Sequence, residues 1–325
     1  MKILAIETSC DETAAAIVEN GTKIISNIVA SSQDMHIKTG GIIPEIAARQ
    51  QIKSMIPVIK EAKAGPIDAL AVTVGPGLIG SLLVGVETAK TLSFLWQKPI
   101  IPVNHLLGHI YANWLGVKKP PQFPALALVV SGGHTDLVIM KGHGNIKWLG
   151  GTRDDAAGEA FDKTARLLGL GYPGGPAISA AAKKYQKSDT RLQMFPRPLI
   201  KEDNYDFSFS GLKTAVAREV KDKKLKETDK QKLAAEIQEA IVDVLVAKSR
   251  KAIAKYLPKS FLLAGGVAAN QRLREKFQLE THFFVPEPKL CTDNAAFIAA
   301  AAFYQKPTNW QRITANPQLT IAQSV

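Results

Sequence analysis

Two histidines, His105 and His109, have the spacing in this chain that most directly suggests chemistry. Two imidazoles four residues apart on a helix lie on the same face, where they can share a metal ion. The same spacing also suits histidines that cap or pack a helix, so the pair alone leaves both interpretations open. Leu106 stands where an HExxH zinc peptidase carries its general-base glutamate, which argues against metal-dependent peptide hydrolysis.

A run of carboxylates between residues 154 and 162 is the second group that could bind a ligand. Asp154 and Asp155 open a predicted helix, where the helix dipole favours acidic residues without any further role. Asp162 lies deeper in that helix, beside Phe161, and its oxygens could accept hydrogen bonds from ribose hydroxyls. Asp162 is therefore the better ligand candidate of the run.

Asp293 precedes an alanine-rich helix predicted over residues 293–303. Either Thr292 or Asp293 suits the N-cap position of that helix. Asp293 could instead be a third metal ligand, completing a set of two histidines and one carboxylate that suits iron or zinc acting on a substrate. The spacing alone favours the cap.

Three glycine turns, at residues 75–77, 131–133 and 265–266, each follow an apolar run. Glycine at the end of a strand lets the backbone approach a ligand, and successive N–H groups can hold a phosphate. Three such turns suggest a nucleotide-sized ligand, although each also suits a plain tight turn. The chain has no GxxxxGK[ST] motif and no GxGxxG after a strand, so the usual P-loop and Rossmann sites are unsupported.

The elements that must position these residues are predicted to form an α/β sheet. Apolar runs over 2–6, 14–18 and 24–30 predict strands, and Asn20–Gly21 between the last two is typical of a hairpin. The elements predicted next are a helix over 45–62, a strand over 69–74, a helix over 81–95 and a strand over 100–103.

The same order restarts after a proline-rich connector over residues 118–124. Later elements are strands over 125–130, 137–140 and 146–149, a charged surface connection over 221–232, a helix over 234–256 and a strand over 260–263. We therefore expect two related α/β domains facing one another across a cleft. Their expected bounds are 1–122 with 293–325 for the first domain and 123–292 for the second.

The composition indicates which kind of partner the chain binds and in which cell compartment it works. The net charge of +12 favours a polyanion such as RNA, although a generally basic surface explains it equally well. Two cysteines, Cys10 and Cys291, argue against a disulfide framework and suit a reducing cytosol. Early acidic residues interrupt any signal-peptide core, and no apolar run reaches the roughly 18 residues of a membrane span, so we expect a soluble, cytoplasmic protein.

Taken together, these stretches closely resemble one family over most of the chain. It is the TsaD-type tRNA threonylcarbamoyladenosine synthase family, formerly described as glycoproteases. The matching segments, in family order, are ETSCDETAAAI, GGIIPEIAARQ, GPGLIGSLLVG, NHLLGH, VSGGHT, DDAAGEAFDK, FSFSGLKTA, GGVAAN and CTDNAA. SGGHT, in place of SGGNT, resembles the bacterial branch.

The resemblance implies an actin-like ATPase (ASKHA) fold, which suits the two similar halves. It also implies that His105, His109 and Asp293 hold one divalent metal, Fe²⁺ or Zn²⁺, which overrides the cap interpretation of Asp293. The pocket for the donor's nucleotide, an adenylate or an ATP-like nucleotide, is implied to be lined by Val130, Ser131, Gly132, Gly133, His134, Asp162, Gly175 and Asn270.

The activity implied by the resemblance is transfer of threonylcarbamoyl from threonylcarbamoyl-AMP to N6 of an adenosine beside the anticodon. The acceptor tRNAs read codons that begin with A, and the product is t6A. Asp11, in the first polar turn, is a candidate for assisting the acceptor amine, and a simple turn role is equally open. The implied partners are the tRNA anticodon arm, a non-catalytic paralogue and a small P-loop ATPase; pairing of the chain with itself stays open.

Three positions depart from the family pattern. Ser179 stands where many relatives carry an aspartate that helps to hold the ligand, which puts that contact in doubt. Val129 stands where archaeal relatives place a tyrosine near the metal, so we expect no tyrosine ligand. Gln51 replaces a histidine that is frequent in the family.

Four other functions compete with this one. A sugar-kinase-like or chaperone-like ATPase would need its own ATP turnover and gives no use for the histidine pair. A metal-dependent protease would need the general-base glutamate that Leu106 replaces in this chain. A metal-dependent carbamoyltransferase acting on a small molecule would share the histidines, and only the basic charge favours tRNA over it. A non-catalytic scaffold would not need an intact set of metal ligands.

Overall fold

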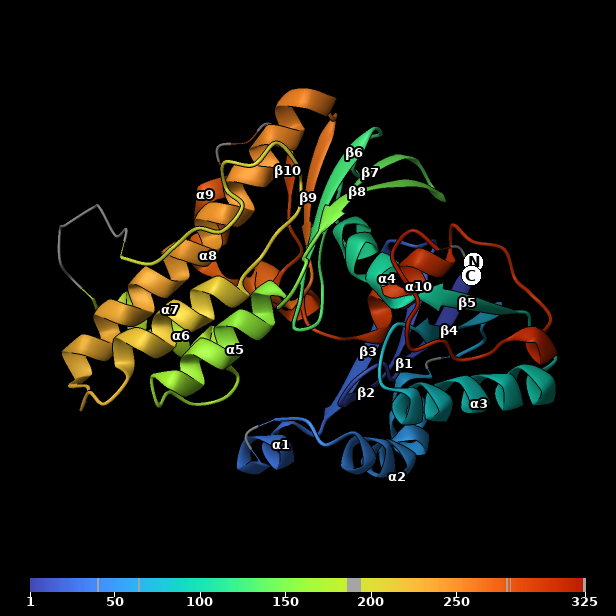
Figure 1. The fold of residues 1–325 in the computed structure, drawn as a ribbon. Coiled ribbons are helices and arrows are strands. Elements are labelled where there is room, and N and C mark those ends of the chain that lie inside the picture. The colour runs from blue at the N-terminus through green and yellow to red at the C-terminus, as the bar shows by residue number, and fades with distance from the viewer. Residues whose placement is uncertain (40, 64, 186–193, 279, 281, 324–325) are drawn as a thin grey trace. The chain divides into compact units, whose positions relative to one another are not determined.

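The computed structural model describes residues 1–39, 41–63, 65–185, 194–278, 280 and 282–323. The chain forms two compact units, which are described separately (Figure 1). Unit 1 comprises Met1–Pro121, Gly142–Ile146 and Pro286–Val325, and unit 2 comprises Gln122–Lys141 and Lys147–Val285. Among the described residues, no helix is both long and apolar enough to cross a membrane.

Unit 1 is built on a five-stranded sheet with the order β3-β2-β1-β4-β5. Strands β1 and β2 and strands β2 and β3 pair antiparallel, whereas β4 runs parallel to both β1 and β5. Asn20 and Gly21 join β2 to β3 with φ angles of 54° and 69°, the left-handed pair that this hairpin turn requires, so that prediction is confirmed. The strands are β1 (Lys2–Glu7), β2 (Glu12–Glu19), β3 (Lys23–Ser31), β4 (Ala69–Gly75) and β5 (Ile100–Asn104).

Helices cover both faces of this sheet. Leu4, Ile6 and Val72 share one core with side chains of α2 and α3. Because side chains alternate along a strand, Ile3 and Ala5 point to the other face, where α10 packs against β1 and β2. The helical elements of unit 1 are α1 (Gln33–Thr39), α2 (Pro44–Ala62), α3 (Ile79–Trp96), α4 (His105–Tyr111), η1 (Ala112–Trp114), η3 (Pro288–Leu290), α10 (Ala295–Ala302) and η4 (Trp310–Arg312).

Unit 2 repeats the same topology. Its sheet has the order β10-β9-β6-β7-β8, which matches β5-β4-β1-β2-β3 strand for strand. As in unit 1, the first strand pairs antiparallel with the second and parallel with a later strand. The predicted similarity of the two halves is thus confirmed at the level of strand order. The strands are β6 (Ala125–Val130), β7 (Thr135–Gly142), β8 (Asn145–Gly151), β9 (Ser260–Ala264) and β10 (Phe283–Phe284).

The helices of unit 2 gather around α8, which packs against α6, α5, α7 and α9 (Figure 1). Helix α8 is the longest, and apolar side chains such as Ile237, Ile241 and Leu245 are fully buried along it. The helical elements are α5 (Ala157–Leu167), α6 (Gly174–Lys183), α7 (Ser210–Val220), α8 (Glu227–Tyr256), η2 (Gly266–Ala269) and α9 (Gln271–Phe277).

Two predicted element boundaries in unit 2 were wrong. Helix α8 begins at Glu227, inside the run expected to be a connection, because Asp229 accepts a hydrogen bond from the Lys226 backbone N–H and caps the start. Helix α5 begins at Ala157, after Asp154, because the Asp154 carboxylate is used elsewhere: it accepts hydrogen bonds from the backbone N–H groups of Phe209 and Ser210 and so caps α7.

Candidate functional site: a histidine–carboxylate cluster and a glycine turn

The predicted histidine pair lies on one helix that starts directly at the end of a strand. Strand β5 ends at Asn104, whose side chain accepts a hydrogen bond from the Leu106 N–H at 2.9 Å and caps α4. His105 and His109 are both buried on this helix, with ring centroids 4.6 Å apart. The prediction that their spacing places both rings on one face is confirmed.

The opposing helix α10 approaches α4 closely because residue 108 is a glycine. A Cβ atom at Gly108 would lie 2.6 Å from Cδ2 of Phe297, a distance that packed atoms do not tolerate. The Phe297 ring packs against His109, with centroids 4.6 Å apart, and against His105 at 5.7 Å. This packing brings the residues that precede α10 up to the two imidazoles.

The N-cap of α10 is Asn294, which corrects the cap interpretation of both Thr292 and Asp293. The Asn294 side-chain oxygen accepts hydrogen bonds from the backbone N–H groups of Ala296 and Phe297. Since Asn294 caps α10, helix capping does not account for the position of the Asp293 carboxylate.

Asp293 lies beside both histidines. Its Oδ1 is 3.3 Å from Nε2 of His109 and 3.6 Å from Nε2 of His105. Ligand atoms held at about 2.1 Å from a metal in tetrahedral directions lie about 3.4 Å apart, so these separations fit a shared ion. The three side chains thus form a candidate metal site.

Burial and hydrogen bonding support the same fit. Among the described residues, neither ring nitrogen of His109 makes a well-aligned hydrogen bond, although both are buried. A buried polar atom without a partner is rare in native proteins, and an ion would satisfy it. Burial and the neighbouring His105 lower the pKa of His109. Burial also lowers the pKa of His105, but Glu7 and Asp293 outweigh it and raise that pKa to about 9.

Additional acidic groups converge on the cluster from the loop between β1 and β2. Burial raises the pKa of Glu12 to about 10, with Asp293 and Asp11 adding their repulsion. Burial and Asp293 also raise the pKa of Cys10, which keeps its thiol protonated. Asp11, the predicted catalytic residue, therefore lies in the same acidic group, where a divalent cation would relieve the repulsion.

The second predicted glycine turn, residues 131–133, follows β6 in unit 2. Val130 is fully buried, the Ser131 N–H donates to the His134 carbonyl, and the Ser131 hydroxyl accepts a hydrogen bond from the His134 N–H. A Cβ at Gly132 or Gly133 would meet no atom within 4 Å, so both backbone segments border open space.

The start of α5 packs directly against this turn. The Gly158 N–H donates to the Ser131 carbonyl at 3.1 Å, and a Cβ at Gly158 would lie 2.6 Å from that oxygen. The missing side chain of Gly158 thus allows the turn to pack directly against the N-terminus of α5. The partial positive charge of a helix N-terminus favours an anion there.

The remaining predicted pocket residues are Asp162 in the middle of α5, Gly175 in the first turn of α6 and Asn270 at the N-cap of α9. One oxygen of Asp162 accepts the Gly174 N–H at 2.7 Å, while Gly175 borders open space. The Asn270 side chain caps α9 through Leu273 and donates to Ser179 and Gln238. Asn270 is therefore already hydrogen-bonded, and Ser179 belongs to the same network because its hydroxyl also donates to Gln238.

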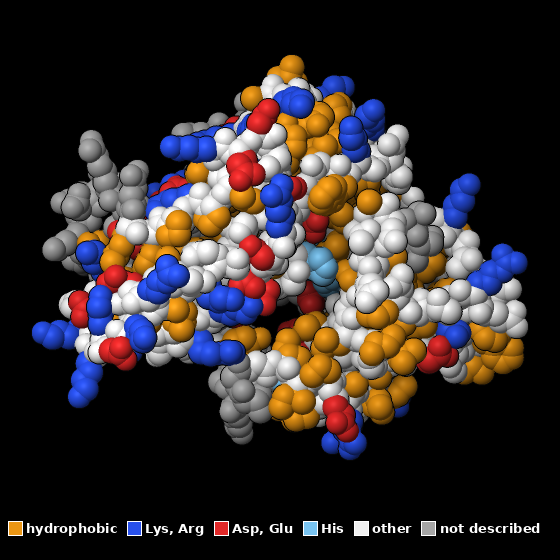
Figure 2. All heavy atoms as spheres, viewed as in Figure 1, with side chains coloured by type: hydrophobic (Ala, Val, Ile, Leu, Met, Phe, Trp, Pro, Cys, Tyr) orange, Lys and Arg blue, Asp and Glu red, His pale blue; other side chains and the backbone are white. Residues whose placement is uncertain are grey.

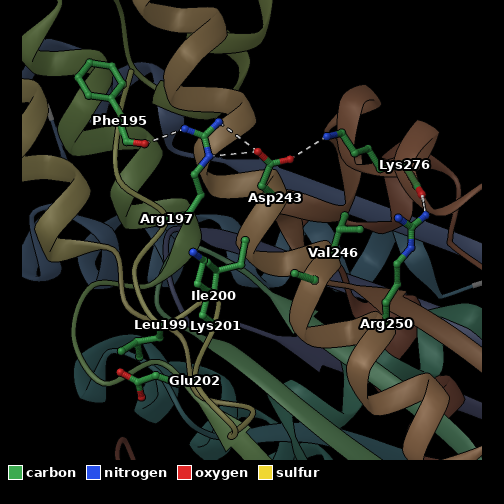
Figure 3. Close-up of a pocket in the computed structure, with 11 residues that line it drawn as sticks. Phe195, Arg197, Leu199, Ile200, Lys201, Glu202, Asp243, Val246, Arg250 and Lys276 are labelled. Carbon is green, nitrogen blue, oxygen red and sulfur yellow. Dashed lines mark hydrogen bonds and ion pairs between the residues drawn. The ribbon is translucent and has the colours of Figure 1, made fainter. Parts of the chain in front are cut away.

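A cavity of ≈ 880 Å³ in unit 2 contains none of the predicted site residues (Figure 3). Most charged side chains that line it form ion pairs. Asp243 pairs with Arg197 and Lys276, and Arg250 pairs with Glu280. Its lining is Phe195, Arg197, Leu199, Ile200, Lys201, Glu202, Asp243, Val246, Ala247, Arg250 and Lys276. Because these charges already satisfy one another, the cavity supplies no clear recognition chemistry for the reaction.

Comparison with known proteins settles the family. Residues 23–300 match the family model described as "TsaD: tRNA N6-adenosine threonylcarbamoyltransferase". The chain belongs to the TsaD family. It is 53% identical to the tRNA N6-adenosine threonylcarbamoyltransferase of Symbiobacterium thermophilum, over 93% of this chain and 91% of that protein. The protein of the same name from Bacillus cereus is 48% identical over 98% of this chain and 96% of its own length.

Solved structures confirm the actin-like α/β fold expected of a TsaD-family chain. The activator of the 2-hydroxyisocaproyl-CoA dehydratase from Clostridium difficile, with bound ADPNP, is 14% identical and superposes with a TM-score of 0.52 over 94% of both chains. HypF from T. kodakarensis, 11% identical, gives a TM-score of 0.57 over 93% of this chain and 47% of its own. At these identities the likeness concerns the fold alone.

Sequence reasoning missed several residues of the candidate site. Glu7 and Glu12 looked like ordinary acids of a polar turn, yet Glu7 contacts His105 and Glu12 joins the acidic group. Gly108 lies inside the motif NHLLGH, and Phe297 directly follows the motif CTDNAA. A glycine between the two histidines was the one signal that could have indicated the close helix contact.

Proposed function

We propose that His105, His109 and Asp293 hold the divalent metal of the reaction that this TsaD-family chain performs, threonylcarbamoyl transfer to the N6 amine of an adenosine in tRNA. One observation carries the assignment: two imidazole nitrogens lie 3.3 Å and 3.6 Å from one carboxylate oxygen, around a buried histidine that makes no well-aligned hydrogen bond. Two histidines and one carboxylate suit Fe²⁺ or Zn²⁺, and a bound ion would act as a Lewis acid toward the donor carbonyl.

We assign the nucleotide half of the donor, threonylcarbamoyl-AMP, to unit 2. The backbone of Gly132 and Gly133 borders open space and can donate N–H groups to a phosphate. Asp162 keeps one oxygen beyond its bond to Gly174 for a ribose hydroxyl. The proposed lining is the predicted one: Val130, Ser131, Gly132, Gly133, His134, Asp162, Gly175 and Asn270.

The chemistry is an acyl transfer from a mixed anhydride. The N6 amine attacks the carbamoyl carbon, the new N–C bond forms, and the C–O bond to AMP breaks. We assign Asp11 to accept the proton that N6 loses, because it is a carboxylate that lies in the same acidic group of unit 1 as Glu12 and Asp293.

The chain's partners follow from the same function. The anticodon arm of tRNA is the acceptor, and the net charge of +12 supports phosphate contacts. We propose a cytoplasmic location, which a tRNA substrate supports. We also propose a small P-loop ATPase and a non-catalytic paralogue as partners, and two domains with the expected bounds of 1–122 with 293–325 and 123–292.

A hydrophobic surface on unit 1 supports a protein partner. Helices α2 and α3 pack against each other and still expose large apolar side chains, among them Ile52 at 64% and Ile56 at 52%. Figure 2 shows hydrophobic side chains gathered over these two helices. Contiguous exposed apolar side chains mark protein interaction sites, so we place the paralogue on this face.

The experiment that tests the function follows labelled threonylcarbamoyl from its adenylate to unmodified tRNA. Wild type and His109→Ala are compared, with and without candidate partners and after chelation and re-addition of Fe²⁺ or Zn²⁺. We expect labelled tRNA with wild type and loss of label in His109→Ala. Label that survives in His109→Ala would overturn the metal site, and unaided ATP hydrolysis without any label would favour the ATPase or kinase alternative.

A further inference from the structure

We propose that Glu7 is a positioning residue of the metal site, which holds the His105 ring so that Nε2 presents its lone pair to the ion. The inference rests on the metal role proposed above for His105, His109 and Asp293. Glu7 itself does not reach the ion in this assignment; it acts through the imidazole.

The geometry begins with the contact between the two side chains. Glu7 ends strand β1 and is completely buried, and its Oε2 lies 3.1 Å from Nδ1 of His105. Nε2 of the same ring faces Asp293 Oδ1 at 3.6 Å. A neutral imidazole carries its proton on one nitrogen only, so a proton held at Nδ1 by Glu7 leaves Nε2 free to bind a metal.

The Glu7 carboxylate is itself fixed. Its Oε1 accepts a hydrogen bond from the Ser9 N–H, and its Oε2 accepts one from the Thr73 hydroxyl. The parallel pairing of β1 with β4 sets Ile6 opposite Val72, which brings Thr73 beside Glu7. Donors on both oxygens lock the carboxylate rotamer and therefore the direction in which His105 can point.

The buried carboxylate of Glu7 has one ionisable partner among the described residues. Its ion-pair partner there is His105, and no lysine or arginine of the described chain lies within ion-pairing distance of it. A buried carboxylate is costly unless it is paired and hydrogen-bonded. A divalent ion on the far side of the imidazole would balance this charge through the ring.

The two imidazoles differ in this respect. Nδ1 of His109 is buried without a hydrogen-bond acceptor in the described structure, whereas Nδ1 of His105 has Glu7 and, at 3.2 Å, the Ser9 hydroxyl. Glu7 therefore orients one ligand of the pair. Ser9 is the competing acceptor, and a test must separate the two.

The test titrates Zn²⁺ alone against a chromophoric chelator, using wild type, Glu7→Gln and Ser9→Ala. Glu236→Gln is the matched control, because Glu236 is also buried and bonded to a backbone N–H, that of Met194, but belongs to unit 2. We expect Glu7→Gln to weaken Zn²⁺ binding by about 10- to 100-fold and Glu236→Gln to leave it unchanged. ¹⁵N NMR of the loaded protein should show His105 protonated at Nδ1 in wild type and Glu236→Gln.

Three outcomes overturn the inference. Equal Zn²⁺ affinity in wild type and folded Glu7→Gln would show that Glu7 does not position His105. A full loss of Zn²⁺ binding in Ser9→Ala would assign the positioning role to Ser9. Wild type that binds no Zn²⁺ removes the metal site together with the inference. Zn²⁺ binding that needs Glu7, in a chain that transfers no label to tRNA, would support the inference while the proposed function fails.

If Glu7→Gln does not fold, Thr73→Val replaces it in the test. We then expect a smaller, several-fold loss of Zn²⁺ affinity, since Thr73→Val removes one of the hydrogen bonds that fix the Glu7 carboxylate.

Discussion

Gly108 and Phe297 are in contact at a place where no side chain larger than hydrogen fits. A Cβ at residue 108 would lie 2.6 Å from Cδ2 and 2.9 Å from Cε2 of the phenylalanine ring. This contact holds α4 against α10 and so keeps both histidines near Asp293. The separation of the side chains proposed to bind the metal therefore depends on a glycine that would not itself contact the ion.

Gly108→Ala should separate the two helices and weaken metal binding. We expect a loss of about 1–3 kcal/mol in the free energy of unfolding from overpacking and at least a tenfold loss in Zn²⁺ affinity. Urea unfolding and chelator competition measure the two effects. Gly142→Ala is the control, because a Cβ there meets nothing within 4 Å. Unchanged Zn²⁺ affinity in Gly108→Ala would show that the helix contact does not set the site.

The site was partly predictable from sequence because some of its determinants are local. The spacing of His105 and His109 fixes one helix face, and Asn20–Gly21 fixes a hairpin. Glu7 was missed because its partner, 98 residues away, is reached only through the sheet and the start of α4. Asp154 was assigned to the wrong helix for a similar reason, since the N–H groups that it caps lie 55 and 56 residues further along the chain.

Gly158→Ala should impair the nucleotide turn and leave the metal site intact. The new Cβ would lie 2.6 Å from the Ser131 carbonyl and 2.8 Å from Cα of Gly132, so the turn must move. If this backbone binds phosphate as proposed, a displacement of this size should lower the affinity for AMP by at least about tenfold, since well-placed hydrogen bonds to a charged group contribute about 1.5–3 kcal/mol. Isothermal titration with AMP measures it, again with Gly142→Ala as control. Unchanged AMP affinity in Gly158→Ala would show that the turn does not bind the donor.

Ile52→Asp should weaken the proposed paralogue complex without destabilising the chain. Ile52 is 64% exposed on α2, so an aspartate there costs little folding free energy but places a charge in an apolar contact. We expect the thermal midpoint to stay the same while association, measured by analytical ultracentrifugation with the paralogue, falls at least tenfold. Leu257→Asp is the control, because Leu257 is an apolar residue of unit 2 that is even more exposed than Ile52, at 78%. Equal losses in both variants would show that the α2–α3 face has no special role.

Asp154 should stabilise the fold in a pH-dependent way. Burial pushes its pKa up, but hydrogen bonds from Ser208, Phe209 and Ser210 outweigh it and hold the pKa below the ordinary 3.8. A carboxyl whose pKa is lower in the folded state stabilises above its unfolded pKa and loses that contribution as the pH falls through the folded value.

Asp154→Asn should therefore destabilise the chain at neutral pH by up to about 1 kcal/mol, because the amide has one acceptor oxygen in place of two and no charge to strengthen the four hydrogen bonds. The difference from wild type should shrink as the pH falls below about 3.8, because the wild-type carboxyl then takes up its proton. Urea midpoints across this range measure it, with Glu61→Gln, an exposed carboxylate on α2, as the control. A difference that stays constant from neutral to acid pH would mean that the Asp154 charge contributes nothing and that the loss comes from altered hydrogen-bond geometry.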